Sequence, residues 1–208
     1  MSHQTSKDEK PCCQGADGAV EQRGRRRVIR IAAAGIVAGL QSNLPAAFAA
    51  VATELRPHEG DRLAGVAATG APAPLKVADI AVGAKPVHAF PLDVASATVR
   101  DGSRFNKVLL VRLPPASLDE ATRARSADGV LAFSAVCTHE GCDVSEWVPA
   151  ENALLCFCHF SKFLPLDAGK VAAGPAPRDL PFLPLRSVNG EIEIAGAFSA
   201  APGPKKQR

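Results

Sequence analysis

The chain of 208 residues has no tyrosine, one tryptophan and one methionine, so no phenol hydroxyl can donate a hydrogen bond anywhere in it. It also lacks a long hydrophobic run. The apolar stretch from Ile31 to Leu40 has about half the length that a membrane-spanning helix needs. Seven of the 24 basic and four of the 21 acidic residues lie in residues 1–49, so residues 50–208 hold 17 of each sign. This neutral balance argues against a nucleic-acid-binding protein.

Residues 1–49 have the pattern of an export signal. A basic cluster precedes the apolar run, and Ala47-Phe48-Ala49 is typical of a signal cleavage site. The stretch Arg25–Arg30 also resembles the twin-arginine pattern, whose pathway exports proteins that are already folded. We therefore predict export to the periplasm by the twin-arginine route, with attachment to the membrane only if this segment is retained as an anchor.

The rest of the chain divides by composition. Residues 50–75 are rich in alanine, glycine and proline and are predicted to be a linker. Residues 76–197 carry short apolar runs broken by glycine, proline and aspartate, which indicate an all-β domain, a small antiparallel sandwich or barrel. Residues 198–208 are predicted to be a flexible tail. The expected strands are 76–82, 87–91, 107–113, 129–136, 152–157, 182–188 and 191–195, with a short helix or polar loop in 115–128 and an Asn189-Gly190 hairpin turn.

Four of the six cysteines lie within 22 residues, together with two histidines, and this density indicates a metal site. Cys137 and His139 are two positions apart, and Cys156 and His159 are three apart, so each pair can reach one metal centre from one loop. Two cysteines and two histidines suit zinc. The same four residues suit a [2Fe–2S] cluster in which two cysteines hold one iron and two histidines hold the other. The mixed pair in each loop favours the cluster.

The two loops closely resemble the motifs of the Rieske family, Cys-Thr-His-x-Gly-Cys and Cys-x-Cys-His-x-Ser. They read Cys-Thr-His-Glu-Gly-Cys over residues 137–142 and Cys-Phe-Cys-His-Phe-Ser over residues 156–161. The stretch Gly174–Pro181 is similar to the proline-rich loop that covers the cluster in this family. The resemblance implies a Rieske-type fold with a cluster-binding subdomain made of two loops and this third loop.

By the same resemblance, Cys137 and Cys156 would hold the inner iron of one [2Fe–2S] cluster, and His139 and His159 would hold the outer iron. Cys142 and Cys158 would form a disulfide between the loops. Both of these cysteines are usually absent from the Rieske domains of ring-hydroxylating oxygenases. Their presence places the chain closer to the electron-transfer members found in respiratory enzymes.

Three further positions bear on the tuning of the cluster. Ser161 matches the family serine whose hydroxyl donates to a cluster sulfur, and Phe163 stands where high-potential members often have tyrosine. We therefore expect a reduction potential below that of the highest-potential members. Phe160 replaces the glycine common in quinol-oxidising complexes, and in this it is similar to the small subunit of arsenite oxidase.

These resemblances imply a periplasmic one-electron carrier subunit of an oxidoreductase complex, with no substrate pocket of its own. The expected donor is a molybdenum-type catalytic subunit, as in arsenite oxidase, and the expected acceptor is a cytochrome c or a cupredoxin. The alternatives are the Rieske subunit of a ubiquinol–cytochrome c reductase, whose partner is cytochrome b, and a stand-alone Rieske ferredoxin.

Overall fold

The computed structural model describes residues 56–66 and 70–205, whose regular secondary structure is mostly β-strand. A single turn of α-helix, α2, spans Glu120–Ala124 within the segment where a short helix or loop is predicted. Five 3-10 turns lie at Val77–Asp79, Arg104–Asn106, Pro115–Ser117, Pro149–Glu151 and Pro165–Asp167. The strands are β1 (Arg62–Gly65), β2 (Val87–Asp93), β3 (Thr98–Val99), β4 (Val108–Arg112), β5 (Val130–Ser134), β6 (Glu146–Val148), β7 (Ala153–Cys156), β8 (Ser161–Leu164), β9 (Lys170–Ala173), β10 (Phe182–Leu183), β11 (Leu185–Val188) and β12 (Glu191–Ile194).

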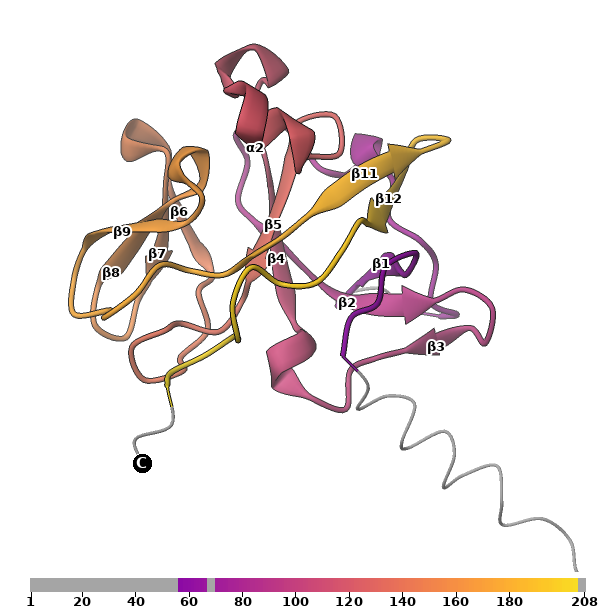
Figure 1. The fold of residues 1–208 in the computed structure, drawn as a ribbon, viewed down its shortest axis with the longest axis horizontal. Coiled ribbons are helices and arrows are strands. Elements are labelled where there is room, and N and C mark those ends of the chain that lie inside the picture. The colour runs from indigo at the N-terminus through magenta and orange to yellow at the C-terminus, as the bar shows by residue number, and fades with distance from the viewer. Residues whose placement is uncertain (1–55, 67–69, 206–208) are drawn as a thin grey trace, which may run out of the picture. The chain divides into compact units, whose positions relative to one another are not determined.

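These strands form two antiparallel sheets (Figure 1). The larger has eight strands in the order β10-β5-β4-β2-β1-β12-β11, with β3 paired to β2, and it curls into a nearly closed barrel. The smaller has the order β6-β7-β8-β9. In the sequence its strands are inserted between β5 and β10, which pair with each other in the larger sheet. The predicted all-β antiparallel fold is confirmed. That the small sheet and its loops form the cluster-binding subdomain implied by the resemblance stays a prediction.

Strands β4 and β5 form a wall between two hydrophobic cores. Successive side chains of a strand point to opposite faces, so a strand buried on both faces serves both sides. The core shared with β7 and β8 takes Leu109, Val111, Leu131 and Phe133, all at most 1% exposed. The core inside the larger sheet takes Val108, Leu110, Val130 and Ala132. Strand β5, which leads into the first metal-binding loop, is therefore fixed from both sides.

The predicted hairpin at Asn189-Gly190 is confirmed. Strands β11 and β12 pair from Leu185 opposite Ile194 to Val188 opposite Glu191. The turn residues Asn189 and Gly190 have φ values of 54° and 80°. Positive φ at both central positions is the requirement of a type I′ turn, which is why this dipeptide is a strong hairpin signal.

Two parts of the predicted organisation differ from the structure. The prediction of a strand at 76–82 is wrong. A 3-10 turn occupies Val77–Asp79, and only isolated β-bridges, at Lys76 and Val82, lie on either side of it. Conversely, β1 lies inside the segment predicted to be a linker, and it fills the sheet position between β2 and β12. Leu63 and Ala64 are buried there, but this apolar run is too short to stand out in a segment rich in glycine and proline.

The two terminal segments differ in how far the structure describes them. Part of the predicted tail, residues 198–205, packs onto the domain: Phe198 contacts the core of the larger sheet and Gly203 is buried. The predicted export signal lies outside the described residues. Within residues 56–66 and 70–205, none of the helices has both the length and the apolar character needed to cross a membrane.

Candidate metal centre

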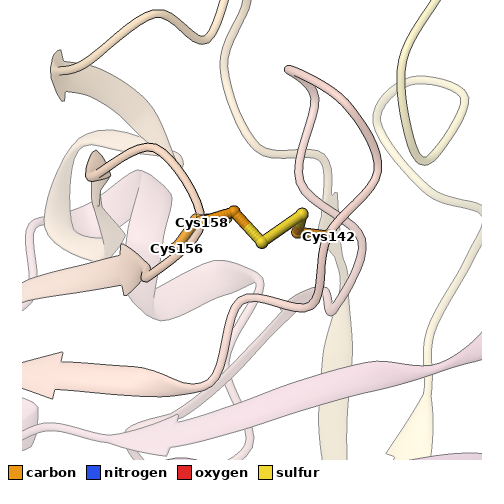
Figure 2. A group of neighbouring side chains, drawn as sticks. All are labelled: Cys142, Cys156 and Cys158. Atoms are coloured by element: carbon orange, nitrogen blue, oxygen red, sulfur yellow. A yellow bond between two sulfur atoms is a disulfide. The ribbon is translucent and has the colours of Figure 1, made fainter.

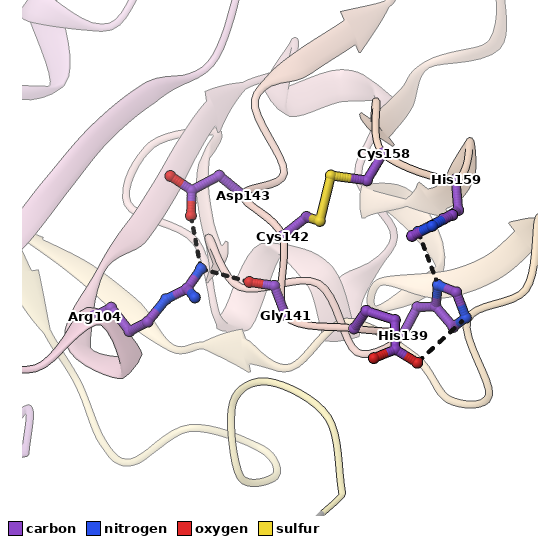
Figure 3. Close-up of a disulfide and its surroundings, with 8 residues drawn as sticks. Arg104, His139, Gly141, Cys142, Asp143, Cys158 and His159 are labelled. Carbon is purple, nitrogen blue, oxygen red and sulfur yellow. Dashed lines mark hydrogen bonds and ion pairs between the residues drawn. A yellow bond between two sulfur atoms is a disulfide. The ribbon is translucent and has the colours of Figure 1, made fainter. Parts of the chain in front are cut away.

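The first loop, Cys137–Cys142, follows β5 and is closed by its own backbone. The amide of Cys137 donates to the carbonyl of Cys142 at 2.8 Å, and the amide of Gly141 donates to the carbonyl of Cys137 at 3.1 Å. From outside the loop, Arg104 Nη2 donates to the carbonyl of Gly141 and pairs with Asp143 at 3.2 Å (Figure 3). The loop is therefore held at its base and along its outer edge.

The second loop, Phe157–Phe160, joins β7 to β8, where Cys156 and Ser161 stand opposite each other in register. Phe160 has a φ of 59°, in the left-handed region that bulky side chains rarely adopt. The rings of Phe157 and Phe160 are 64% and 60% exposed, and their centroids are 5.6 Å apart. The loop thus presents an aromatic pair to solvent on either side of His159 in the sequence.

Cys137 and Cys156 are the free cysteines among the described residues, and each is 1% exposed. Burial is the main reason why the pKa of the Cys137 thiol is raised to about 11, and the neighbouring Cys156 acts in the same direction. The amide of His139 and the hydroxyl of Ser161 donate hydrogen bonds to the Cys137 sulfur and oppose this rise in pKa. Two buried sulfurs thus share one site, and donors are already directed at one of them.

The two histidines meet nearer the surface. Their Nδ1 atoms are 3.2 Å apart, and the rings are perpendicular with centroids 4.7 Å apart (Figure 3). Nε2 of His139 lies 3.8 Å from Oε1 of Glu140, and the His139 side chain is 24% exposed, whereas His159 is an exposed residue. Both imidazoles therefore turn the same nitrogen toward one point. Two thiols and two imidazoles fit a [2Fe–2S] cluster with a sulfur side and a nitrogen side, although this donor set by itself also suits zinc.

The remaining two loop cysteines form the disulfide Cys142–Cys158, as the resemblance implied. The sulfur of Cys156 lies within 4.8 Å of both disulfide sulfurs (Figure 2). Because Cys142 and Cys158 are bonded to each other, only Cys156 of these three can serve as a metal ligand. The disulfide joins the two loops across 16 positions of sequence, and the chain-entropy model attributes about 3 kcal/mol of stability to a link of this length.

The proline-rich stretch 174–181 packs against the second loop. Gly174 has a φ of 86°, and a Cβ added to it would lie 2.5 Å from Cα of Ser161 and 2.7 Å from the carbonyl oxygen of Phe160. The amide of Ala176 donates to Oγ of Ser161 at 3.2 Å. Ser161 thus accepts one hydrogen bond from this stretch, and its hydroxyl also lowers the pKa of the Cys137 thiol as a hydrogen-bond partner.

The same stretch reaches the first loop through Thr138, which is completely buried. Oγ1 of Thr138 donates to the carbonyl of Arg178 at 2.6 Å. The sequence alone predicted no role for Thr138, Arg178 or Arg104. Thr138 lies in the first Rieske-like motif and Arg178 lies in the proline-rich stretch, so their positions could have marked them as part of the site. Arg104 is 37 positions from the carbonyl it binds, and no motif includes it.

Residues 106–184 match the Rieske [2Fe-2S] domain. The Rieske iron-sulfur subunit of the cytochrome bc1 complex of Streptomyces lividans is 34% identical over 136 residues, which cover 63% of this chain and 79% of that protein. The chain belongs to the Rieske [2Fe–2S] family. This Rieske protein is also 38% identical over 107 residues to a putative respiratory nitrate reductase subunit Rieske of Haloferax mediterranei.

The match to the Haloferax mediterranei protein covers 50% of this chain and 48% of the relative, so the chain spans about half of that relative's length. Among solved structures, the soluble domain of Rieske protein II from Sulfolobus acidocaldarius superposes with a TM-score of 0.34 and 25% identity, over 46% of this chain and 66% of that one.

Family membership selects the cluster over zinc: the Rieske protein carries one [2Fe–2S] cluster and transfers electrons. The structure places the thiols of Cys137 and Cys156 as neighbours and the imidazoles of His139 and His159 as neighbours, and the assignment of these four residues as the ligands stays a prediction. When bound, the cluster supplies one-electron transfer at a potential raised by two neutral imidazole ligands. The protein buries the thiols, directs the Ser161 hydroxyl at one of them and leaves His159 accessible to a partner.

Replacing Ser161 with alanine is expected to lower the reduction potential on the order of 50 mV. The reduced cluster carries more negative charge, so the hydroxyl donor stabilises it more than the oxidised cluster, and about 1.4 kcal/mol corresponds to 59 mV for one electron. Phe163, fully buried in the core, has no donor to compensate. Protein-film voltammetry measures the shift, with Ser117→Ala on an exposed 3-10 turn as the control. A potential equal to that of the control contradicts the assigned donor.

Proposed function

We propose that this Rieske protein is the one-electron carrier subunit of a respiratory oxidoreductase complex. The proposal rests on the 34% sequence identity between this chain and the Streptomyces lividans bc1 subunit. The match covers 79% of the length of that subunit. The burial pattern supports it, because the two thiols that would hold one iron are buried, whereas His159, which would hold the other, is exposed. An electron carrier needs such a side, since a partner must approach its cluster closely.

Two donors are considered. A cytochrome b subunit with quinol as the reductant is favoured by the likeness to the bc1 Rieske subunits. A molybdenum-type catalytic subunit is favoured by Phe160, which replaces the glycine common in quinol-oxidising complexes, and by the likeness to the putative nitrate reductase subunit. In either arrangement the proposed acceptor is a cytochrome c or a cupredoxin. We further propose a periplasmic location reached by the twin-arginine route, supported by the Arg25–Arg30 pattern.

Affinity purification of the full-length protein from its native cells tests the proposal. Membrane and soluble periplasmic fractions are purified separately, and each is assayed for iron, b-type haem and molybdenum. Haem b in the membrane eluate supports the cytochrome b partner, and molybdenum without haem b supports the second donor. Recovery as a lone monomer from both fractions contradicts a subunit role and favours the stand-alone ferredoxin. The N-terminal residue of the purified chain shows whether the signal is cleaved.

The aromatic pair Phe157 and Phe160 is expected to form part of the contact with the acceptor. Exposed aromatic side chains are frequent anchors of protein interfaces, and this pair flanks the accessible histidine. Replacing both with alanine is expected to slow the oxidation of reduced protein by a soluble cytochrome c about tenfold. Stopped-flow absorbance measures the rate. Val94→Ala, which removes a similarly exposed apolar side chain elsewhere, is the control. Equal rates for both variants contradict the assigned contact.

A further inference from the structure

The last described segment of the chain lies against the first metal-binding loop. After β12 the chain is fixed to β10, where the amide of Ser199 donates to the carbonyl of Phe182 at 2.9 Å and Oγ of Ser199 accepts from the amide of Phe182 at 3.0 Å. The following residues, Ala201–Pro204, are called the C-terminal strap here. The chain therefore reaches this loop by a defined path.

Packing holds the strap against the residues that flank the first loop. Gly203 is buried, and a Cβ added to it would lie 2.6 Å from the ring of Phe105 and 3.3 Å from Cγ1 of Val136, the residue before Cys137. The ring of Pro204 lies close to Gly141: a Cβ on that glycine would be 3.4 Å from Cδ of the proline. The strap thus lies beside Val136, which precedes the loop, and beside Gly141 near the loop's end.

Arg178 connects the strap to the proline-rich stretch. Its Nη2 donates to the carbonyl of Ala201 at 2.6 Å and also to the carbonyl of Gly203. The backbone carbonyl of the same residue accepts the hydrogen bond from Thr138, which stands between Cys137 and His139 in the first loop. One residue therefore binds the strap through its side chain and the first loop through its backbone.

We propose that the C-terminal strap is a fourth element of the cluster cradle and that Arg178 is the positioning residue that couples it to the first loop. The strap covers the outside of this loop, and the guanidinium keeps the Arg178 carbonyl where Thr138 can donate to it. Groups that orient the ligands of a metal site typically change its affinity by 10–100-fold when removed. The inference rests on the assignment of Cys137 and His139 as ligands, and it holds for either proposed partner because it concerns the isolated protein.

Three variants of the full cluster-loaded protein test the proposal. They are a truncation after Ala200, Arg178→Gln and the combination of both. We expect each to release iron to a chelator about tenfold faster than the parent and to shift the g-values of the reduced cluster in the paramagnetic resonance spectrum. The combination is expected to match the single variants, because all three remove the same connection. Arg178→Lys is expected to restore the parent spectrum in part, since it keeps one donor.

Two controls separate this role from general stabilisation. Arg123→Gln removes another arginine that donates from Nη2 to a backbone carbonyl, that of Leu118, away from the strap. Truncation after Lys205 keeps the whole strap. Both are expected to behave as the parent. The proposal is overturned if truncation after Ala200 leaves iron release and spectrum unchanged. It is also overturned if this truncation and Arg178→Gln both fail to fold, which would show that the segment supports the whole domain.

Discussion

Protein carrying His139→Ala or His159→Ala is expected to contain no intact [2Fe–2S] cluster, and the same result is expected for Cys137→Ala and Cys156→Ala. The two histidine Nδ1 atoms lie 3.2 Å apart and the two buried thiols are neighbours, so each replacement removes one of the four predicted ligands. An iron that lacks one of its four protein-side or sulfide ligands and lies next to an exposed side chain is open to water, and it is readily lost. Iron content per chain and the paramagnetic resonance spectrum of dithionite-reduced protein measure the outcome.

His88→Ala is the matched control for the histidine variants. Nε2 of His88 is 3.0 Å from the carbonyl oxygen of Val144, two residues after the first loop, so this histidine is also hydrogen-bonded near that loop. It has no cysteine at ligand spacing. This variant is expected to keep the iron content of one cluster. Full iron content and an unchanged spectrum in His159→Ala would falsify the ligand assignment.

Gly174→Ala is expected to destabilise the domain by about 3 kcal/mol or more and to impair cluster retention. A methyl group there would lie 2.5 Å from Cα of Ser161 and 2.7 Å from its amide nitrogen, and both are backbone atoms that cannot rotate away. The φ of 86° adds conformational strain for any residue with a side chain. Urea unfolding, followed by far-ultraviolet circular dichroism and by cluster absorbance, measures both effects.

Gly190→Ala is the control that separates the backbone strain of a positive φ from the steric clash at Gly174. Gly190 has a similar φ of 80°, but nothing lies within 4 Å of the position that a Cβ would take. Its replacement is expected to cost about 1 kcal/mol from conformation alone and to leave the cluster in place. If Gly174→Ala and Gly190→Ala destabilise the domain equally, the close approach of the proline-rich stretch to the second loop has no energetic importance.

The metal site was largely predictable because its chemistry is local in sequence. Each loop supplies one cysteine, one histidine and one disulfide partner within six residues, and the resemblance to the Rieske motifs assigned all six. The structure shows the disulfide, the pairing of the two histidines and the proximity of the two free thiols, and the assignment of these four as ligands stays a prediction. The all-β fold was predictable for a similar reason, since short apolar runs and a strong Asn-Gly turn mark most of the strands of the larger sheet.

What supports the site was less visible, because those contacts join residues far apart in sequence. The bond from Arg104 to the Gly141 carbonyl and the bonds from Arg178 to the strap span 37, 23 and 25 positions. In the sequence, Arg104 resembles an ordinary surface residue, and the glycine and proline of the strap resemble ordinary tail residues. Strand β1 was missed because tertiary pairing with β2 and β12, and not local preference, makes Leu63 and Ala64 a strand.

The wall formed by β4 and β5 limits which fragments of this electron carrier keep a complete hydrophobic core. Its alternating side chains fill both cores, so a fragment containing only β6–β9 and their loops would leave out Leu109, Leu131 and Phe133, against which its own apolar side chains pack. Such a fragment would also lose the strand from which the first loop departs. The smallest piece that can be transplanted into another protein as a redox module is therefore the whole barrel together with its insertion.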